Sequence, residues 1–255
     1  MTGRALILVY HAIEHGPTPL CIPPTLFQEH LDCLVEAGTP VVTLAELIDD
    51  LRAGGTLDNA VAITFDDGFQ SVVDQAAPLL AERGLRATVF CVAGHLGARN
   101  DWPSQPARFP VRPLADASSL MSLAACGFDL GSHGMDHTPL AGASADVVER
   151  EVAGSRAMLE ATAGIPVRWF AYPYGVTPAP AARALVAGIY EGACANALRP
   201  VRPSADLFAL PRVDAHYLRR PELFRAALRG LDSYLDVRRA AARLRRVLRP
   251  DFRAG

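Results

Sequence analysis

The stretch AVAITFDDG, residues 60–68, runs from a short branched apolar segment directly into two aspartates. The apolar part has the length and composition of a buried strand, and residues 70–83 have helical period. The strand therefore ends at Asp66 and Asp67, and in a barrel of parallel strands the carboxyl ends form the catalytic rim. Taken alone, however, an Asp-Asp-Gly sequence is more often a turn that caps a helix.

The same alternation of strand and helix extends in both directions from this stretch, and it is typical of a parallel sheet or barrel. Strands are expected over residues 5–10, 41–43, 60–65, 87–92, 128–131, 168–171, 189–195 and 208–213. Helices are expected over residues 26–36, 44–51, 70–83, 145–162 and 221–228. The Pro-rich residues 102–113 interrupt the pattern and are expected to form a long loop over one end of the barrel.

Length and composition indicate one globular domain. A strand-and-helix barrel uses 255 residues as a single unit, and a net charge of -2 with half of the residues apolar excludes a nucleic-acid-coating protein. The five cysteines form no Cys-x-x-Cys pair and are expected to be reduced core thiols. The N-terminus has no signal-peptide core, and no run approaches the roughly 20 apolar residues of a membrane span. We therefore expect a cytoplasmic protein.

The composition changes at the C-terminal end, which divides the chain into a barrel, residues 1–230, and a basic amphipathic tail, residues 231–255. Leucines fall near one helical face of the tail, and arginines cover the rest. We expect a terminal helix that packs on the barrel with a solvated arginine face. Docking to an anionic membrane surface is the alternative, and it would place the protein at the inner face of the membrane.

A second motif, SHGMDH at residues 132–137, follows the predicted strand 128–131. Its imidazoles, His133 and His137, are four residues apart, close enough to bind one cation. A lone His-x-x-x-His is a weak signal. With the carboxylate of Asp67 it becomes a two-His, one-carboxylate set, which leaves positions open for water and substrate, as a catalytic metal requires.

A third motif, RWFAYPYG at residues 168–175, ends another strand at the same rim. Pro and Gly flank Tyr174 and indicate a rigid turn, whose backbone N–H can point at a developing oxyanion. Arg168 can hold a carboxylate in its ionised form. Seen alone, this segment would more simply be a strand-to-helix turn with a surface arginine.

Taken in this order, TFDDG, SHGMDHTPL and RWFAYPYG resemble the first three motifs of the polysaccharide deacetylases, the NodB-homology family of carbohydrate esterases. LVYH at residues 8–11 and LPRVD at residues 210–214 also resemble one branch of that family. The resemblance extends over nearly the whole chain, from residue 6 to residue 228. It implies an α/β fold with an irregular (β/α)7-type barrel.

The resemblance also assigns roles to single residues. It implies Asp67, His133 and His137 as ligands of a divalent metal, for which zinc is expected and cobalt, nickel or iron are alternatives. Asp66 is implied as the general base, which takes a proton from the attacking water. Further roles follow for Arg168, as the partner that orients Asp66, and for the Tyr174 backbone, as the oxyanion donor.

The late segment RVDAHY, residues 212–217, departs from the family pattern. It has neither the tryptophan of the family's fourth motif nor the Leu-x-His that supplies the general acid. Because expelling an amine requires a proton, His11 or His216 is expected to replace that acid. We favour His216 slightly, since it lies where the family keeps its acid and two residues after Asp214. Gly134 replaces the hydroxyl residue that usually follows the first metal histidine.

The sequence therefore predicts a metal-dependent amide hydrolase, most simply an N-deacetylase of an N-acetylated amino sugar or glycan. The lack of an export signal favours a lipid-linked precursor or a small glycoside over finished wall polymer. A deformylase or imidase-like amidohydrolase of the same fold is the second interpretation. A non-hydrolytic glycan-binding module is the third, and the missing family acid would fit it.

Overall fold

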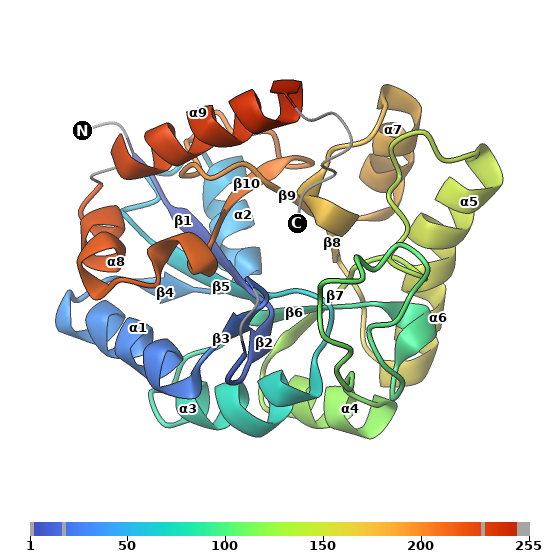
Figure 1. Ribbon diagram of the computed structural model, residues 1–255, viewed down its shortest axis with the longest axis horizontal. Coiled ribbons are helices and arrows are strands. Elements are labelled where there is room, and N and C mark those ends of the chain that lie inside the picture. The colour runs from blue at the N-terminus through green and yellow to red at the C-terminus, as the bar shows by residue number, and fades with distance from the viewer. Residues whose placement is uncertain (1–2, 17–18, 231–232, 249–255) are drawn as a thin grey trace.

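The computed structural model describes residues 3–16, 19–230 and 233–248 of the chain. Its centre is a parallel sheet in the order β1-β10-β9-β8-β7-β6-β5-β4, which an additional pairing of β1 with β5 closes into a barrel (Figure 1). β4 (Val41–Val42) pairs with β5 outside this ring. The strands of the ring are β1 (Leu6–Tyr10), β5 (Val61–Phe65), β6 (Thr88–Cys91), β7 (Asp129–Ser132), β8 (Trp169–Ala171), β9 (Gly192–Asn196) and β10 (Leu210–Asp214). The predicted α/β barrel of (β/α)7 type is therefore confirmed.

The irregular part of the barrel is β5. Its amino half pairs with β4 through Val61, and its carboxyl half pairs with β6 through Thr64 and Phe65. Along its other edge β1 runs in register, from Leu6 opposite Val61 to Tyr10 opposite Phe65. Both strands are buried along their whole length, as their apolar sequences require in a sheet covered on both faces. The residues that follow them leave the barrel at the same rim.

Alternate residues of the strands pack into two apolar clusters. Ile7 of β1, Ala62 of β5 and Trp169 of β8 belong to the cluster that fills the barrel. Leu6 and Leu8 belong to the cluster between the strands and the surrounding helices. This division follows from the two-residue period of a strand, which sends successive side chains to opposite faces.

Helix α2 (Leu44–Arg52) closes the amino-terminal end of the barrel. It begins with a capping box, in which Thr43 accepts from the Glu46 N–H and the Glu46 carboxylate accepts from the Thr43 N–H. Its apolar face packs into the inner cluster, and a Cβ on Gly192 of β9 would lie only 2.7 Å from Ile48. Because this end is filled, the carboxyl rim is the end at which a site can open.

The other helices surround the barrel (Figure 1). They are α1 (Pro24–Glu36), α3 (Ala77–Ala81), α4 (Ala117–Ala125), α5 (Ala145–Glu149), α6 (Ser155–Ala163), α7 (Pro180–Ile189), α8 (Pro221–Leu228) and α9 (Ser233–Leu248). The helices expected at residues 26–36, 44–51 and 221–228 are confirmed. Those expected at residues 70–83 and 145–162 each contain a π-helical turn, Val72–Ala76 before α3 and Arg150–Gly154 between α5 and α6.

The prediction misses α4 and α7, together with a short parallel pair formed by β2 (Ala12–Ile13) and β3 (Cys21–Ile22). Leu120 and Leu123 are the buried residues of α4, and Ala182 and Val186 are those of α7. Two buried positions are too few to give a recognisable helical period.

The C-terminal helix α9 lies along one side of the barrel (Figure 1), and the first turn of the helix packs on the core. Leu235 is buried in the core cluster, Val237 is 67% exposed, and the Arg238 guanidinium lies over the rings of Tyr217 and Tyr234. The domain boundary at residue 230 stays a prediction, and residues 231–232 and 249–255 of the expected tail lie outside the described residues. Among the described helices, none has both the length and the apolar character that crossing a membrane needs. None of the five cysteines, all of which lie within the described residues, forms a disulfide, and Cys126 alone of them is exposed.

Candidate active site

Asp66 and Asp67 follow β5 at the carboxyl rim, and both are buried, with 2% and 5% of their surface exposed. The Asp66 N–H donates to the Tyr10 carbonyl at 2.9 Å, which extends the pairing of β1 with β5. Asp67 then takes the left-handed conformation at φ 69°, and Gly68 follows at φ 74°. This turn interrupts the alternation of the strand, so that two successive carboxylates line the same cavity.

His133 and His137 come from the segment after β7 and meet Asp67 from the other side. His133 Nδ1 donates to the Ala171 carbonyl at 2.8 Å. Since a carbonyl only accepts, the proton is on Nδ1, and Nε2 presents its lone pair 3.5 Å from Asp67 Oδ1. His137 Nε2 lies 3.4 Å from the same oxygen and 3.2 Å from His133 Nε2.

These three donor atoms suit a divalent cation. The ligand atoms of Asp67, His133 and His137 lie within 4.8 Å of one another. Asp67 Oδ1 is buried and has no hydrogen-bond partner among the described residues. A buried carboxylate oxygen that faces two imidazole nitrogens is costly unless a cation lies between them. The structure thus brings together the three residues that the sequence indicates as ligands.

Burial sets the protonation states of this group. Burial raises the pKa of Asp67 well above its usual range, and the neighbouring charge of Asp66 adds to the rise. Burial also lowers the pKa of His133 and His137. The imidazoles are therefore neutral near pH 7, which is the form that binds a metal. A bound cation would remove the cost of the charge on Asp67.

Arg212 of β10 is the partner of Asp66, and its guanidinium is fully buried. It donates from both terminal nitrogens to the two Asp66 oxygens at 2.6 Å each, and its Nε donates to Asn196 at 3.2 Å. Burial alone would raise the pKa of Asp66, but Arg212, and then His133, bring it below the usual range. Asp66 is therefore ionised throughout the working pH range.

The prediction that Arg168 orients Asp66 is wrong. Arg168 directly precedes β8 and so lies at the amino end of that strand, opposite the catalytic rim. There it forms a bidentate ion pair with Glu191, at 2.7 and 2.8 Å, with 38% of its side chain exposed. The signal for Arg212 was present in LPRVD, because an arginine inside an apolar strand must find a buried carboxylate.

Tyr174 lies in a tight turn, Pro173–Gly175, and takes the left-handed conformation at φ 59°. Its ring contacts the His137 ring edge-on, with the centroids 4.5 Å apart. Its hydroxyl donates to the Ser104 carbonyl at 2.7 Å, and Ser104 Oγ donates to the His137 carbonyl at 2.9 Å. The long loop predicted at residues 102–113 is therefore fastened directly over the rim. The role of the Tyr174 backbone as oxyanion donor stays a prediction.

A cavity of about 60 Å³ opens between these groups. Its polar lining consists of His11, Asp66, Asp67, Gln105, His133, His137, Tyr174, Asn196 and Asp214. Its apolar lining includes Leu20, Trp102 and Phe109, and Trp102 packs on the His137 ring with the centroids 4.5 Å apart. Trp102, Phe109 and Gln105 could not be found from sequence period, because they lie in a loop, which has no periodic pattern.

Of the two candidate acids, the structure brings His11 to the cavity and leaves His216 outside its lining. Burial lowers the pKa of His11, while the charges of Asp214 and Asp66 act in the opposite direction. Burial, and then Arg219, lower the pKa of His216. The position in the cavity therefore favours His11 over His216. Asp214 lines the cavity, and its Oδ1 accepts a hydrogen bond from the backbone N–H of His216 at 2.8 Å.

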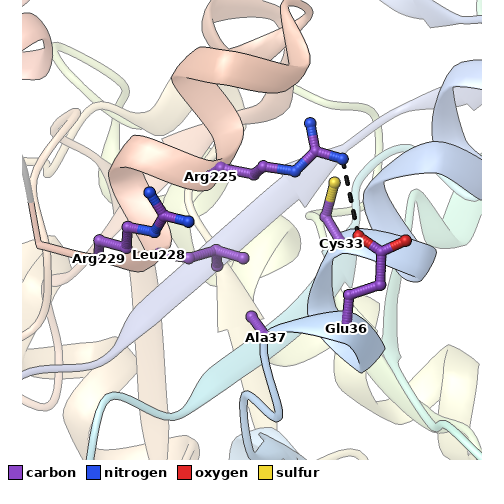
Figure 2. A pocket seen from close by; sticks show the side chains of 6 residues that line it. All are labelled: Cys33, Glu36, Ala37, Arg225, Leu228 and Arg229. Carbon is purple, nitrogen blue, oxygen red and sulfur yellow. Dashed lines mark ion pairs between the residues drawn. The ribbon is translucent and has the colours of Figure 1, made fainter.

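A second cavity of about 190 Å³ lies between α1 and α8, and its lining has different chemistry (Figure 2). The lining residues are Cys33, Glu36, Ala37, Arg225, Leu228 and Arg229. Glu36 and Arg225 form an ion pair at 3.7 Å, and burial raises the pKa of the Cys33 thiol. A protonated thiol beside an ion pair offers neither a base nor a ligand set, so the smaller cavity at the rim is the candidate active site.

Known proteins resemble the part of this chain that contains Asp66, Asp67 and the two histidines. Residues 53–189, more than half of the chain, match the family model for polysaccharide deacetylase. YxkH of Bacillus subtilis, whose name assigns it to the polysaccharide deacetylases, is 26% identical over 173 residues, or 66% of this chain and 56% of that protein. A poly-beta-1,6-N-acetyl-D-glucosamine N-deacetylase of Staphylococcus epidermidis is 26% identical over 196 residues, or 73% of this chain and 65% of the enzyme. The chain thus spans less than two thirds of each relative.

A solved structure extends the likeness to the whole barrel. IcaB from Ammonifex degensii superposes with a TM-score of 0.73 at 24% identity, over 91% of this chain and 97% of that one. At this identity the likeness shows the fold. The matched segment 53–189 contains Asp66, Asp67, His133 and His137, and it ends before Arg212. On the strength of that match, this chain belongs to the polysaccharide deacetylase family.

Proposed function

We propose that the chain is a metal-dependent N-deacetylase that hydrolyses the amide of an N-acetylated amino sugar. The observation that carries this proposal is the buried Asp67 Oδ1, which faces the Nε2 atoms of His133 and His137 at 3.5 and 3.4 Å. Membership of the polysaccharide deacetylase family supplies the reaction class, hydrolysis by a deacetylase. The metal and the substrate are our inference.

Asp67, His133 and His137 would hold the metal. Zinc suits two imidazoles and one carboxylate, and cobalt, nickel and iron are the alternatives. When bound there, a divalent cation would polarise the amide carbonyl and lower the pKa of the attacking water.

Asp66 is the proposed general base. Arg212 keeps its carboxylate ionised and fixes both oxygens, while His133 Nε2 lies 3.7 Å from Asp66 Oδ2. The carboxylate therefore lies beside the proposed ligand set without belonging to it. In this position it can take a proton from water as that water attacks the carbonyl carbon.

Two further groups would complete the reaction. Negative charge develops on the former carbonyl oxygen, and the proposed donor to it is the backbone N–H of Tyr174. When the C–N bond breaks, the amine takes a proton, and His11 is the proposed acid. Burial lowers the pKa of His11, and the charge of Asp214, which lines the same cavity, opposes that fall.

The size and lining of the cavity support a small acyl group. The cavity measures about 60 Å³, a small volume that suits a short acyl group. Trp102, Phe109 and Leu20 give it an apolar wall suited to a methyl group. The buried Nε2 of Gln105 has no partner among the described residues and can donate to a substrate oxygen.

The larger part of the substrate is proposed from likeness. The Staphylococcus epidermidis relative is named for a polymer of N-acetyl-D-glucosamine, and we propose an N-acetylated glycan, lipid-linked precursor or small glycoside here. The cytoplasmic location and a contact of the C-terminal helix with the inner face of the membrane stay predictions.

The test is a screen of N-acetyl, N-formyl and cyclic imide substrates, soluble and lipid-linked, with the metal-loaded chain. Acetate and free amine released from an N-acetylated sugar are the expected products. Formate or a ring-opened amide as the main product would assign the chain to a deformylase or imidase-like reaction. Glycan binding without amine release, with one metal bound, would favour the non-hydrolytic module.

A further inference from the structure

We infer that Glu151 is a positioning residue that fixes the spacing of His133 and His137, an inference that rests on the proposed function. Glu151 lies in the π-helical turn Arg150–Gly154 and is 1% exposed. Its carboxylate makes no contact with the reacting groups described above. It acts on the loop between the two histidines.

The Glu151 carboxylate accepts hydrogen bonds from three backbone N–H groups of that loop. Oε2 accepts from Met135 at 2.9 Å, and both oxygens accept from Asp136, at 3.1 and 3.2 Å. Thr138 donates to Oε2 at 3.3 Å. Hydrogen bonds from N–H groups to a charged acceptor are about twice as strong as neutral ones, and a buried acceptor strengthens them further.

These donors lie between His133 and His137 or directly after them. The loop is not helical, because Gly134 and His137 both have positive φ, at 88° and 56°. Its N–H groups therefore have no helical carbonyl to bind, and the Glu151 carboxylate takes that place. A loop held by one rigid acceptor keeps the two imidazole nitrogens at the separation that a cation needs.

Gly134 gives independent support from packing. A Cβ on Gly134 would lie 2.4 Å from Glu151 Oε2 and 3.6 Å from Pro173. No side chain therefore fits at position 134 while Glu151 occupies its present place. This explains why a glycine follows the first proposed metal histidine, where the resemblance to the family implies a hydroxyl residue.

A second contact runs from the same helical segment to the same loop. Ser155, one helical turn after Glu151, shares a hydrogen bond with Ser132 at 2.7 Å between the hydroxyl oxygens. Ser132 Oγ in turn accepts the Gly134 N–H at 3.1 Å. Two buried groups of one helix face thus hold both the start and the middle of the loop, and π-helical turns of this kind often occur at functional sites.

The expected effect is on metal affinity. Removing a residue that orients metal ligands typically costs about 10- to 100-fold in affinity, and we expect a loss in this range for Glu151→Ala. Glu151→Gln keeps one acceptor oxygen and should lose less. The cobalt-loaded Glu151→Ala variant should also show an altered visible absorption spectrum, because the two imidazoles no longer hold one geometry.

The experiment measures zinc affinity of the full chain, stripped of metal, by competition with a chromogenic chelator, after circular dichroism has shown that each variant is folded. Glu160→Gln is the matched control, since Glu160 in α6 also accepts a loop N–H, from Val167 at 2.9 Å, away from the site. We expect unchanged affinity in that control. Glu151 variants with the zinc affinity and cobalt spectrum of the unmodified chain would overturn the inference, while the proposed function would stand. If the unmodified chain binds no metal, the proposed function fails and the inference fails with it.

If Glu151→Ala does not fold, Glu151→Gln and Gly134→Ala carry the test. Gly134→Ala should weaken zinc binding, because the new methyl group displaces the Glu151 carboxylate. Where Glu151→Ala does fold, adding Gly134→Ala to it should cost less affinity than Gly134→Ala alone costs, since the clash with the carboxylate is gone and only the strain of a side chain at φ 88° remains. Full affinity in both single variants would overturn the inference.

Discussion

Arg212 and Asp66 form a bidentate ion pair with both donor-acceptor distances at 2.6 Å, inside the barrel, where neither side chain is more than 2% exposed. The pair joins β10 to the end of β5. Arg212 also donates to Thr64 and Asn196, so its position is fixed from three sides. The proposed base is thus held by a residue far from it in the sequence.

Replacing Arg212 with alanine should abolish most activity and destabilise the fold. The change leaves the Asp66 carboxylate buried without a counter-ion, which typically costs about 3–5 kcal/mol. It also raises the pKa of Asp66, because burial then loses the largest influence that opposes it, the charge of Arg212. Thermal denaturation and kcat measured on the folded fraction check both parts.

Arg168→Ala is the control for this prediction. Its partner Glu191 is 43% exposed, and exposed ion pairs contribute about 0–1 kcal/mol. We expect activity and melting temperature close to those of the unmodified chain. A loss of activity equal to that of Arg212→Ala would show that the arginine partners have been assigned in the wrong order.

Asp66→Asn should keep the metal and lose turnover. Asparagine preserves the shape of the side chain but cannot take a proton, and loss of a general base costs about 10²- to 10⁴-fold in rate. The proposed ligands Asp67, His133 and His137 are untouched, so zinc content should stay at one equivalent. Measured kcat near that of the unmodified chain would move the base to another residue.

Substitution of the three proposed metal ligands should remove the metal, unlike substitution of Asp66. His133→Ala, His137→Ala and Asp67→Ala should each strip the metal, as measured by elemental analysis of the purified variants. Each removes one of the donor atoms that lie within 4.8 Å of one another. Full metal content in all three variants would remove the site from this cavity.

Asp67→Asn should stabilise the metal-free protein at neutral pH. A carboxyl group whose pKa is raised on folding stabilises the fold below its unfolded pKa, about 4, and loses that contribution as pH rises through the folded pKa. Asparagine has no such loss. The melting temperature of the stripped variant should therefore exceed that of the stripped unmodified chain at pH 7 and approach it near pH 4. Added zinc should reverse the order at pH 7.

The sequence predicted the parts of this site that lie next to a strand. Asp66 and Asp67 follow a clear buried strand, and His133 and His137 follow another, so the rim rule places them together. A parallel sheet or barrel was open to prediction for the same reason, since its strands carry continuous apolar runs, whereas the (β/α)7 type was implied by the resemblance to the polysaccharide deacetylases. For Arg212, which acts across the barrel, the sequence indicates a buried carboxylate as the partner but does not say which carboxylate it is.

Sequence spacing alone does not assign the partners of Arg168 and Arg212. Each stands beside or within a strand, and sequence spacing does not reveal which end of its strand faces which partner. The buried carboxylate pairs with Arg212, because Arg212 lies within β10, whereas Arg168 precedes β8 and pairs with Glu191 near the surface. The role inferred for Glu151 could not be predicted from the sequence. It depends on a π-helical turn, and helical period does not distinguish such a turn from an ordinary helix.

The acid assignment gives the last prediction, which compares His11→Gln with His216→Gln. Loss of the protonated acid as pH rises produces the alkaline limb of the kcat profile. His11→Gln should remove or shift that limb and lower kcat. His216→Gln should leave both unchanged, because His216 is outside the cavity lining.

Asp214→Asn tests the same assignment by the direction in which the alkaline limb of the kcat profile moves. The Asp214 charge raises the pKa of His11, whereas burial lowers it. Without that charge the imidazole loses its proton at lower pH, so the alkaline limb should move to lower pH while zinc content is retained. A solvent-exposed acid would show little response to this substitution, since water screens the charge. If the limb persists unmoved in the His11→Gln and Asp214→Asn variants, with kcat near normal in both, His11 is not the donor. The amine must then take its proton from water or from Asp66, which the attacking water has just protonated.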